Sequence, residues 1–125
     1  MAWTAEPSLP TPSMGLAAAV SDAPPSGSGQ WVYAIGGTNS NLLAALEGYD
    51  TVQKSWSTRP SMPTARTALA AASPGRIHVL GGSAQSNVLT THEVYEPAND
   101  TWSTAEPLPA ARGALAAVTR PDGLI

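Results

Sequence analysis

The feature that most constrains this chain is a sequence pattern that occurs twice, about 46 residues apart. Each copy has an apolar run that ends in two glycines, then a tyrosine two residues after a glutamate, and then a tryptophan. The matching residues are Gly36, Gly37, Tyr49 and Trp56 in the first copy and Gly81, Gly82, Tyr95 and Trp102 in the second. Such a period indicates repeated structural units, each of which buries its apolar face against a neighbour.

The similarity continues beyond each tryptophan. In both copies a proline follows the tryptophan by seven residues and an arginine follows by ten, and these arginines are Arg66 and Arg112. Trp3 is also followed by a proline at that spacing, but Ser13 stands where the arginine would be. The first copy is longer because of residues 21–29, whose Ser, Gly and Pro content is typical of a loop.

This ordered set of residues closely resembles the kelch repeat, and the resemblance covers nearly the whole chain. It implies an all-β fold: a partial kelch-type β-propeller with two four-stranded antiparallel blades plus flanking strands of adjacent blades. Propellers close with about four to eight blades, so we expect a fragment of a larger propeller. The expected units are an outer strand of a preceding blade with its linker at 1–12, repeat 1 at 13–58 with the insertion at 21–29, repeat 2 at 59–104, and the incomplete start of a third repeat at 105–125.

Within a repeat we expect four strands. For repeat 2 they are 66–73, 76–82, 90–96 and 101–104; residues 1–5 and 112–119 are the expected outer and inner strands of the neighbouring blades. The paired glycines would allow a positive φ and a close approach of backbones. The repeated tyrosines and tryptophans are expected to pack in the blades. Trp31 has no aromatic counterpart in repeat 2, so it is the least constrained aromatic residue and a surface contact is open to it.

The composition argues against several functional classes. Charged residues make up 12% of the chain and its net charge is −3, without the basic stripe of a nucleic-acid-binding protein. No apolar run approaches the ~20 residues of a membrane span. With no cysteine, there is no disulfide, thiolate nucleophile or cysteine-bound zinc, and we expect no cofactor. The compartment is unknown; the lack of a signal-peptide pattern favours the cytoplasm, unless the chain belongs to a larger secreted protein.

An enzyme is not expected. Phosphate-binding and nucleophile-elbow motifs are missing from the sequence. Galactose-oxidase-like propellers use a cysteine-modified tyrosine, and sugar-mutarotase-like propellers use the mouth of a complete ring. A fragment of such a carbohydrate-active enzyme, or a non-functional gene fragment, is therefore the alternative. Glu47 and Glu93 occupy equivalent positions in the two repeats, which favours an architectural role over a catalytic one. Two alternatives stay open for them: pairing with the repeat arginine, or exposure to solvent. His78 aligns with Tyr33 and is expected to be packed, and Asn99 is expected in a turn.

Because strands alternate in direction, the loops that enter the first strand and those that join the second and third strands share one end of the blades. We call this end, residues 38–43, 57–66, 83–89 and 103–112, the loop face. We predict that it binds a protein or acidic peptide, with an anionic carbohydrate as another option. The candidate contacts are Arg66, Arg112, Thr38, Asn39, Asn41, Gln85 and Asn87. For the arginines, which grip carboxylates with a planar fork, an internal role stays equally open. Open blade faces also predict self-association.

Overall fold

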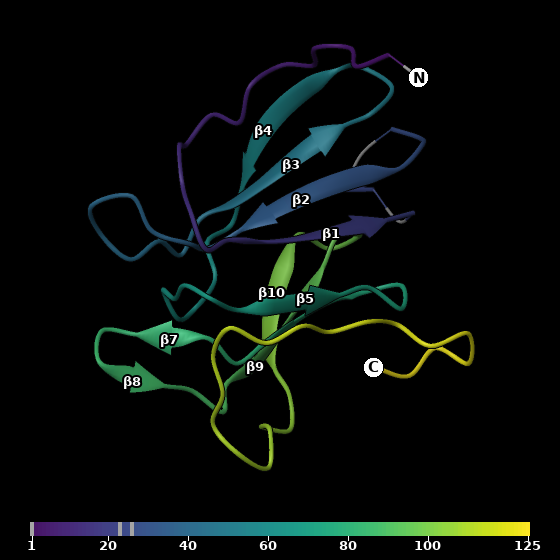
Figure 1. Ribbon diagram of the computed structural model, residues 1–125. Coiled ribbons are helices and arrows are strands. Elements are labelled where there is room, and N and C mark those ends of the chain that lie inside the picture. The colour runs from purple at the N-terminus through teal and green to yellow at the C-terminus, as the bar shows by residue number, and fades with distance from the viewer. Residues whose placement is uncertain (1, 23, 26) are drawn as a thin grey trace.

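Two four-stranded antiparallel sheets lie next to each other in this chain (Figure 1). The computed structural model describes residues 2–22, 24–25 and 27–125, and this part of the chain contains no helix. The strands are β1 (Ala17–Ser21), β2 (Trp31–Ile35), β3 (Leu46–Asp50), β4 (Ser55–Arg59), β5 (Ala70–Ala72), β6 (Ile77–Leu80), β7 (Ser83–Ala84), β8 (Asn87–Val88), β9 (His92–Glu96) and β10 (Thr101–Thr104).

Each sheet is one of the predicted blades. The first blade has the strand order β1-β2-β3-β4, and the second has β5-β6-β9-β10. The small β7–β8 hairpin belongs to the part of the sequence that connects β6 to β9. The outer strand over Thr101–Thr104 is confirmed with its predicted bounds. The inner strand is shorter than the predicted 66–73, since β5 covers only Ala70–Ala72. Its missing beginning is explained by Ala68, whose φ of 54° interrupts an extended strand.

The inner segments of successive repeats are joined by single backbone hydrogen bonds. The Ala68 N–H donates to the Gly15 carbonyl at 2.8 Å, and the Ala114 N–H donates to the Ala68 carbonyl at 2.8 Å. All three residues have a positive φ, of 66°, 54° and 52° in chain order. The third repeat therefore begins in the same way as the second.

Two of the predicted strands are absent. Residues 2–5, the described part of the predicted outer strand at 1–5, and residues 112–119 do not form strands. A β-strand is defined by its ladder of inter-strand hydrogen bonds, and neither segment lies beside a neighbour that offers one. Residues 2–13 instead run across the first blade, and residues 105–118 run across the second (Figure 1).

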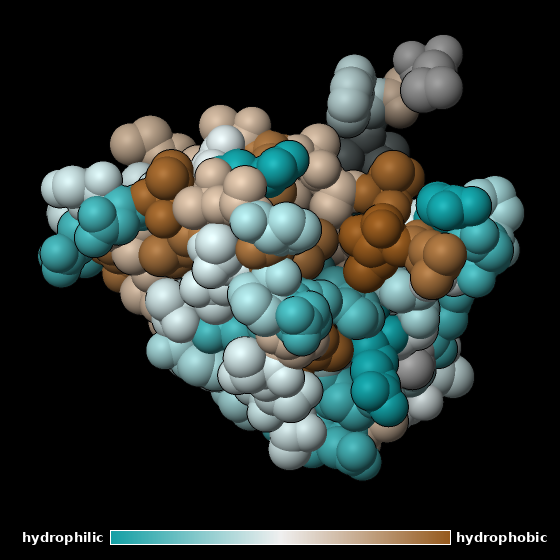
Figure 2. All heavy atoms as spheres, turned by 90° about the horizontal axis from the view of Figure 1, so that it is seen from below, coloured by the Kyte–Doolittle hydropathy of each residue, from teal (hydrophilic) through white to brown (hydrophobic). Residues whose placement is uncertain are grey.

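Apolar residues gather on the side of the second blade that faces away from the first. They line a groove of about 310 Å³ together with Arg112: Leu80, Leu108, Leu115, Ala116, Ala117, Val118 and Ile125. Figure 2, which views the molecule from this lower side of Figure 1, shows hydrophobic side chains exposed at several places. Val118 remains 74% exposed. An apolar open face is thus confirmed, whereas self-association through it stays a prediction.

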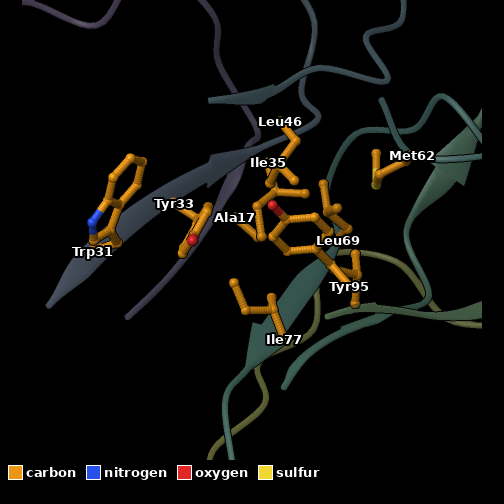
Figure 3. Packing of buried hydrophobic residues seen from close by; sticks show 10 residues of the cluster. Ala17, Trp31, Tyr33, Ile35, Leu46, Met62, Leu69, Ile77 and Tyr95 are labelled. Carbon is orange, nitrogen blue, oxygen red and sulfur yellow. The ribbon is translucent and has the colours of Figure 1, made fainter. Parts of the chain in front are cut away.

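The main core lies between the two blades (Figure 3). Alternate residues of β2 point into it, including Tyr33 and Ile35, and they meet Ile77 and Tyr95 of the second blade. The rings of Tyr33 and Tyr95 pack edge to face with centroids 5.6 Å apart, which confirms that Tyr95 contacts the neighbouring blade. Burial raises the pKa of Tyr33 to about 12.

Trp31 belongs to the same core, so it does not make the surface contact that the sequence left open to it. It lies two residues before Tyr33 on β2, so both side chains point to the same face of the sheet. Trp31 is only 5% exposed, its ring stacks on Tyr33 with centroids 6.3 Å apart, and the Arg59 guanidinium lies 5.8 Å from its centroid. An arginine held over an indole is a favourable cation–π contact, and it helps to close this end of the core.

The paired glycines have the role that the sequence predicts. Gly36, Gly37, Gly81 and Gly82 all have a positive φ, between 59° and 97°. A Cβ atom on Gly36 would lie 2.7 Å from the Arg66 carbonyl oxygen, and one on Gly81 would lie 2.5 Å from that of Arg112. The glycines therefore admit the inner segment of the following repeat.

The repeated tyrosine and tryptophan pack against each other in both blades. The ring centroids are 5.1 Å apart for Tyr49 and Trp56 and 5.3 Å apart for Tyr95 and Trp102. Both tryptophans are half-buried, and each indole N–H donates to a proline carbonyl: Trp56 to Pro7 at 2.9 Å and Trp102 to Pro60 at 2.7 Å. The predicted packing role is confirmed, and the hydrogen bonds tie each outer strand to the segment that precedes its blade.

Candidate functional site

The loop face presents two polar loops at the same end of the blades. The segment between β2 and β3 and the β7–β8 hairpin both project there (Figure 1). Asn39, Asn41, Gln85 and Asn87 are exposed, as a binding surface requires, and Thr38 is half-buried. Exposed amides offer both donors and acceptors of hydrogen bonds, so these side chains can meet the polar groups of another chain.

The first of these loops is held in one shape by its own hydrogen bonds. The Asn39 side-chain oxygen accepts from the backbone N–H groups of Ser40 at 2.6 Å and Asn41 at 3.3 Å. The Thr38 hydroxyl donates to the Asn41 carbonyl at 3.0 Å. Backbone hydrogen bonds in both directions, each 2.9 Å long, also join Thr38 to Met14. A loop fixed in this way loses little conformational entropy when it binds.

A hollow lies beside this loop. It is lined by Pro12, Ser13, Met14, Thr38 and Asn39 and has a volume of about 230 Å³. Met14 is 67% exposed, so the hollow offers one flexible apolar side chain next to a polar rim. Such a combination suits the side chain of a binding partner.

Arg66, in contrast, is fully buried, with 0% of its surface exposed. Its guanidinium forms an ion pair with Glu93 at 2.7 Å and donates to the carbonyls of Gly81 at 2.9 Å and Thr91 at 3.0 Å. Burial lowers the pKa of Arg66, while the charge of Glu93 and its hydrogen bond raise it again. The prediction that Arg66 contacts a partner is wrong: it connects β6, β9 and the inner segment, which is the architectural role left open above.

Arg112 has the equivalent place in the sequence and a different environment. It is exposed, and its side chain makes no hydrogen bond or ion pair within residues 2–22, 24–25 and 27–125. Its backbone N–H donates to the Leu89 carbonyl at 3.1 Å, and its carbonyl accepts from Gly82 at 2.9 Å. The guanidinium is thus carried by a fixed backbone at the base of the β7–β8 hairpin and is free to bind an anion.

The comparison with known families agrees with this architecture. The family model of the Kelch motif matches residues 29–63, which run from before β2 to beyond β4. Residues 29–63 therefore carry a kelch motif. The second blade repeats the glycine pair, the tyrosine, the tryptophan and the strand order of the matched region. A search of curated proteins found none that matches the chain.

The two glutamates of the kelch blades differ in their partners. Glu93 is 2% exposed and pairs with Arg66, so of the two alternatives the architectural role holds for it. Glu47 is 4% exposed, but its hydrogen bond within the described residues comes from the Thr11 N–H, 3.3 Å from Oε2. The sequence already carries the cause of this difference, since Ser13 replaces the repeat arginine.

A pair of histidines lies on the outer side of the second kelch blade. His78 Nδ1 and His92 Nε2 are 2.9 Å apart, and His92 Nδ1 is 2.9 Å from the Glu106 carbonyl oxygen. His78 is half-buried, less than the packed histidine that we predicted, because its side of the blade is only partly covered. Burial, His92 and Arg76 together lower the pKa of His78. No sequence signal indicated this pairing, since the two residues lie on different strands.

Two further features bear on the type of site. In the described part of the chain, no group of three or more His, Asp or Glu side chains is placed to hold a metal ion. The same part contains no helix with the length and apolar character needed to cross a membrane.

Asn99 lies in the turn between β9 and β10, as predicted.

Proposed function

We propose that this kelch chain is a protein-interaction module that binds a protein or peptide through its loop face. The observation that carries the proposal is the presence of exposed side chains on fixed backbones there. Asn39 and Asn41 project from a loop held by internal hydrogen bonds, and Arg112 projects from a backbone tied to both ends of the β7–β8 hairpin. Function is commonly carried by loops on a rigid scaffold.

The chemistry of this surface favours an extended acidic peptide. Amide side chains can pair with the N–H and C=O groups of a peptide backbone, and an arginine can grip a carboxylate with two parallel hydrogen bonds. The chain carries a net charge of −3, so the exposed guanidinium of Arg112 is a local positive site. Amides, hydroxyls and one guanidinium bind and orient a partner, and we assign them no catalytic step.

The proposal is tested with peptides selected from a random displayed library on the immobilised chain. The selected peptides should be enriched in Asp and Glu. For the best of them, Arg112→Ala should weaken binding about 10- to 100-fold, the range expected for loss of a charge-assisted contact. Asn41→Ala should weaken it less.

Arg76→Ala provides the matched control, since Arg76 is also an exposed arginine but forms an ion pair with Glu96 near the opposite end of the blade. This variant should bind like the wild type. Equal losses in Arg76→Ala and Arg112→Ala would show a general charge effect and contradict a site on the loop face. A set of selected peptides without acidic residues would contradict the partner class.

A further inference from the structure

The two kelch blades provide an internal comparison at the positions of Glu47 and Glu93. In the second blade, Glu93 accepts from the Arg66 guanidinium at 2.7 Å and from the Thr64 hydroxyl at 2.7 Å. Both oxygens of this buried carboxylate therefore have partners. Burial of a carboxylate is costly unless it is paired and hydrogen-bonded, and the second blade meets this requirement with its own arginine.

Among the described residues, no cation pairs with the buried carboxylate of the first blade. Ser13 holds the position of the arginine, and a small cavity lies beside it, lined by Thr11, Ser13, Gly36, Glu47 and four apolar or small residues. The cavity has a volume of about 10 Å³, which is the space of about one water molecule. Glu47 is 4% exposed, and its carboxylate accepts one hydrogen bond from the wall of the cavity, donated by the Thr11 N–H at 3.3 Å.

We propose that this cavity is a binding site for a guanidinium cation, either the free ion or the side chain of an arginine from a partner. The second blade shows the chemistry: the equivalent carboxylate holds a guanidinium in this place. Ser13 lines both this cavity and the surface hollow beside Asn39, so the cavity lies next to the loop face. The inference uses residues other than Arg112 and stands independently of the acidic-peptide proposal.

Binding of a guanidinium requires this cavity to enlarge, and we expect the wall formed by Leu9, Thr11 and Ser13 to move. Leu9, Thr11 and Ser13 belong to a segment without strand pairing. The attachments of this segment to the first blade include the Trp56 indole bond to Pro7 and the Tyr49 hydroxyl bond to Glu6 at 2.5 Å. A planar guanidinium would replace the water-sized space, separate Thr11 from Glu47 and take over the pairing of the carboxylate.

The first experiment measures thermal or urea unfolding in guanidinium chloride at low millimolar concentrations, against sodium chloride at the same ionic strength. When the concentration of guanidinium is ten times its dissociation constant, binding lowers the unfolding equilibrium constant about 11-fold. The wild type should show this gain, and Glu47→Gln, which keeps the shape but removes the charge, should lose it. Glu106→Gln is the matched control, since Glu106 is an exposed carboxylate that does not line the cavity, and it should respond like the wild type. Equal responses of the wild type and Glu47→Gln would overturn the proposal.

The second experiment supplies the cation within the chain. Ser13→Arg should stabilise the protein and abolish the response to guanidinium, because its side chain would occupy the cavity. A folded Ser13→Arg protein that still gains stability from guanidinium as the wild type does would overturn the proposal. If this variant fails to fold, the Glu47→Gln comparison still decides.

The source of the cation is distinguished with N-acetyl-arginine amide, and N-acetyl-lysine amide serves as the control. Stabilisation by the arginine derivative that depends on Glu47 supports a site open to a partner's arginine. Stabilisation by guanidinium alone supports a closed ion site. A response to neither compound would overturn the proposal.

Discussion

Replacing Arg66 with methionine tests the architecture of the second blade most directly. Methionine keeps much of the apolar stem and removes the guanidinium. Glu93, whose side chain is 3% exposed, would lose its ion pair at 2.7 Å. The carbonyls of Gly81 and Thr91 would lose donors at 2.9 and 3.0 Å. The variant leaves a buried charge, one buried acceptor and one part-buried acceptor without these partners.

Removal of one member of a buried ion pair costs about 3–5 kcal/mol, mainly because the other charge stays buried. Both members here are almost fully buried, so little solvent screening reduces this figure. The unfolding equilibrium constant should therefore rise by about 10²- to 10⁴-fold. Because small domains are stable by only about 5–15 kcal/mol in total, this single change would remove a large part of the stability.

The measurement is urea unfolding followed by tryptophan fluorescence, with Arg66→Met, Glu93→Gln and the double variant compared. The double variant should be more stable than Arg66→Met alone, because the uncompensated charge is gone. A loss below about 1 kcal/mol in Arg66→Met, with an unchanged dependence on urea, would refute the reasoning. So would a double variant that is less stable than Arg66→Met, since the cost would then come from packing.

Two further predictions concern backbone conformation and pH. Gly81→Ala should destabilise the chain by more than about 1 kcal/mol, because φ is 59° and the new Cβ would lie 2.5 Å from the Arg112 carbonyl oxygen. Ala68→Gly, at a φ of 54°, should instead stabilise it by up to about 1 kcal/mol. Urea unfolding compares the two variants, and equal effects on stability would contradict the conformational argument. Lowering the pH below about 6.5 should destabilise the wild type, because the pKa of His78 is lower in the folded chain than in the unfolded one and the unfolded state takes up the proton first. Thermal unfolding between pH 7 and 5 should show a flatter dependence for His78→Gln, and an unchanged slope would exclude this histidine as the source.

The spacing of residues predicts the blades well because it reflects the strand ladder itself. The glycine pairs require a positive φ, and the alternation along β2 places Tyr33 toward the neighbouring blade, so local chemistry is sufficient for these features. The burial of Trp31 is missed when the two repeats are compared by residue type, because Trp31 has no aromatic counterpart in repeat 2. Its position two residues before Tyr33 carries the correct information.

The candidate site is less predictable, because it depends on where long side chains turn. Arg66 and Arg112 have the same sequence context, yet one guanidinium is buried against Glu93 and the other is exposed. The difference arises because β6 and β9 surround Arg66, whereas no equivalent strands surround Arg112 in the described part of the chain. The replacement of the arginine by Ser13 is visible in the sequence. The cavity beside Glu47 requires the three-dimensional arrangement.

The hydrogen bonds between repeats also bear on how the chain folds as it is synthesised. The Ala68 N–H donates to Gly15, and the Trp102 indole donates to Pro60, so in both cases the acceptor lies earlier in the chain. Each sheet is built from one continuous stretch of sequence. The strands of the first sheet therefore all emerge from the ribosome before those of the second, and these two acceptors are already made when their donors emerge.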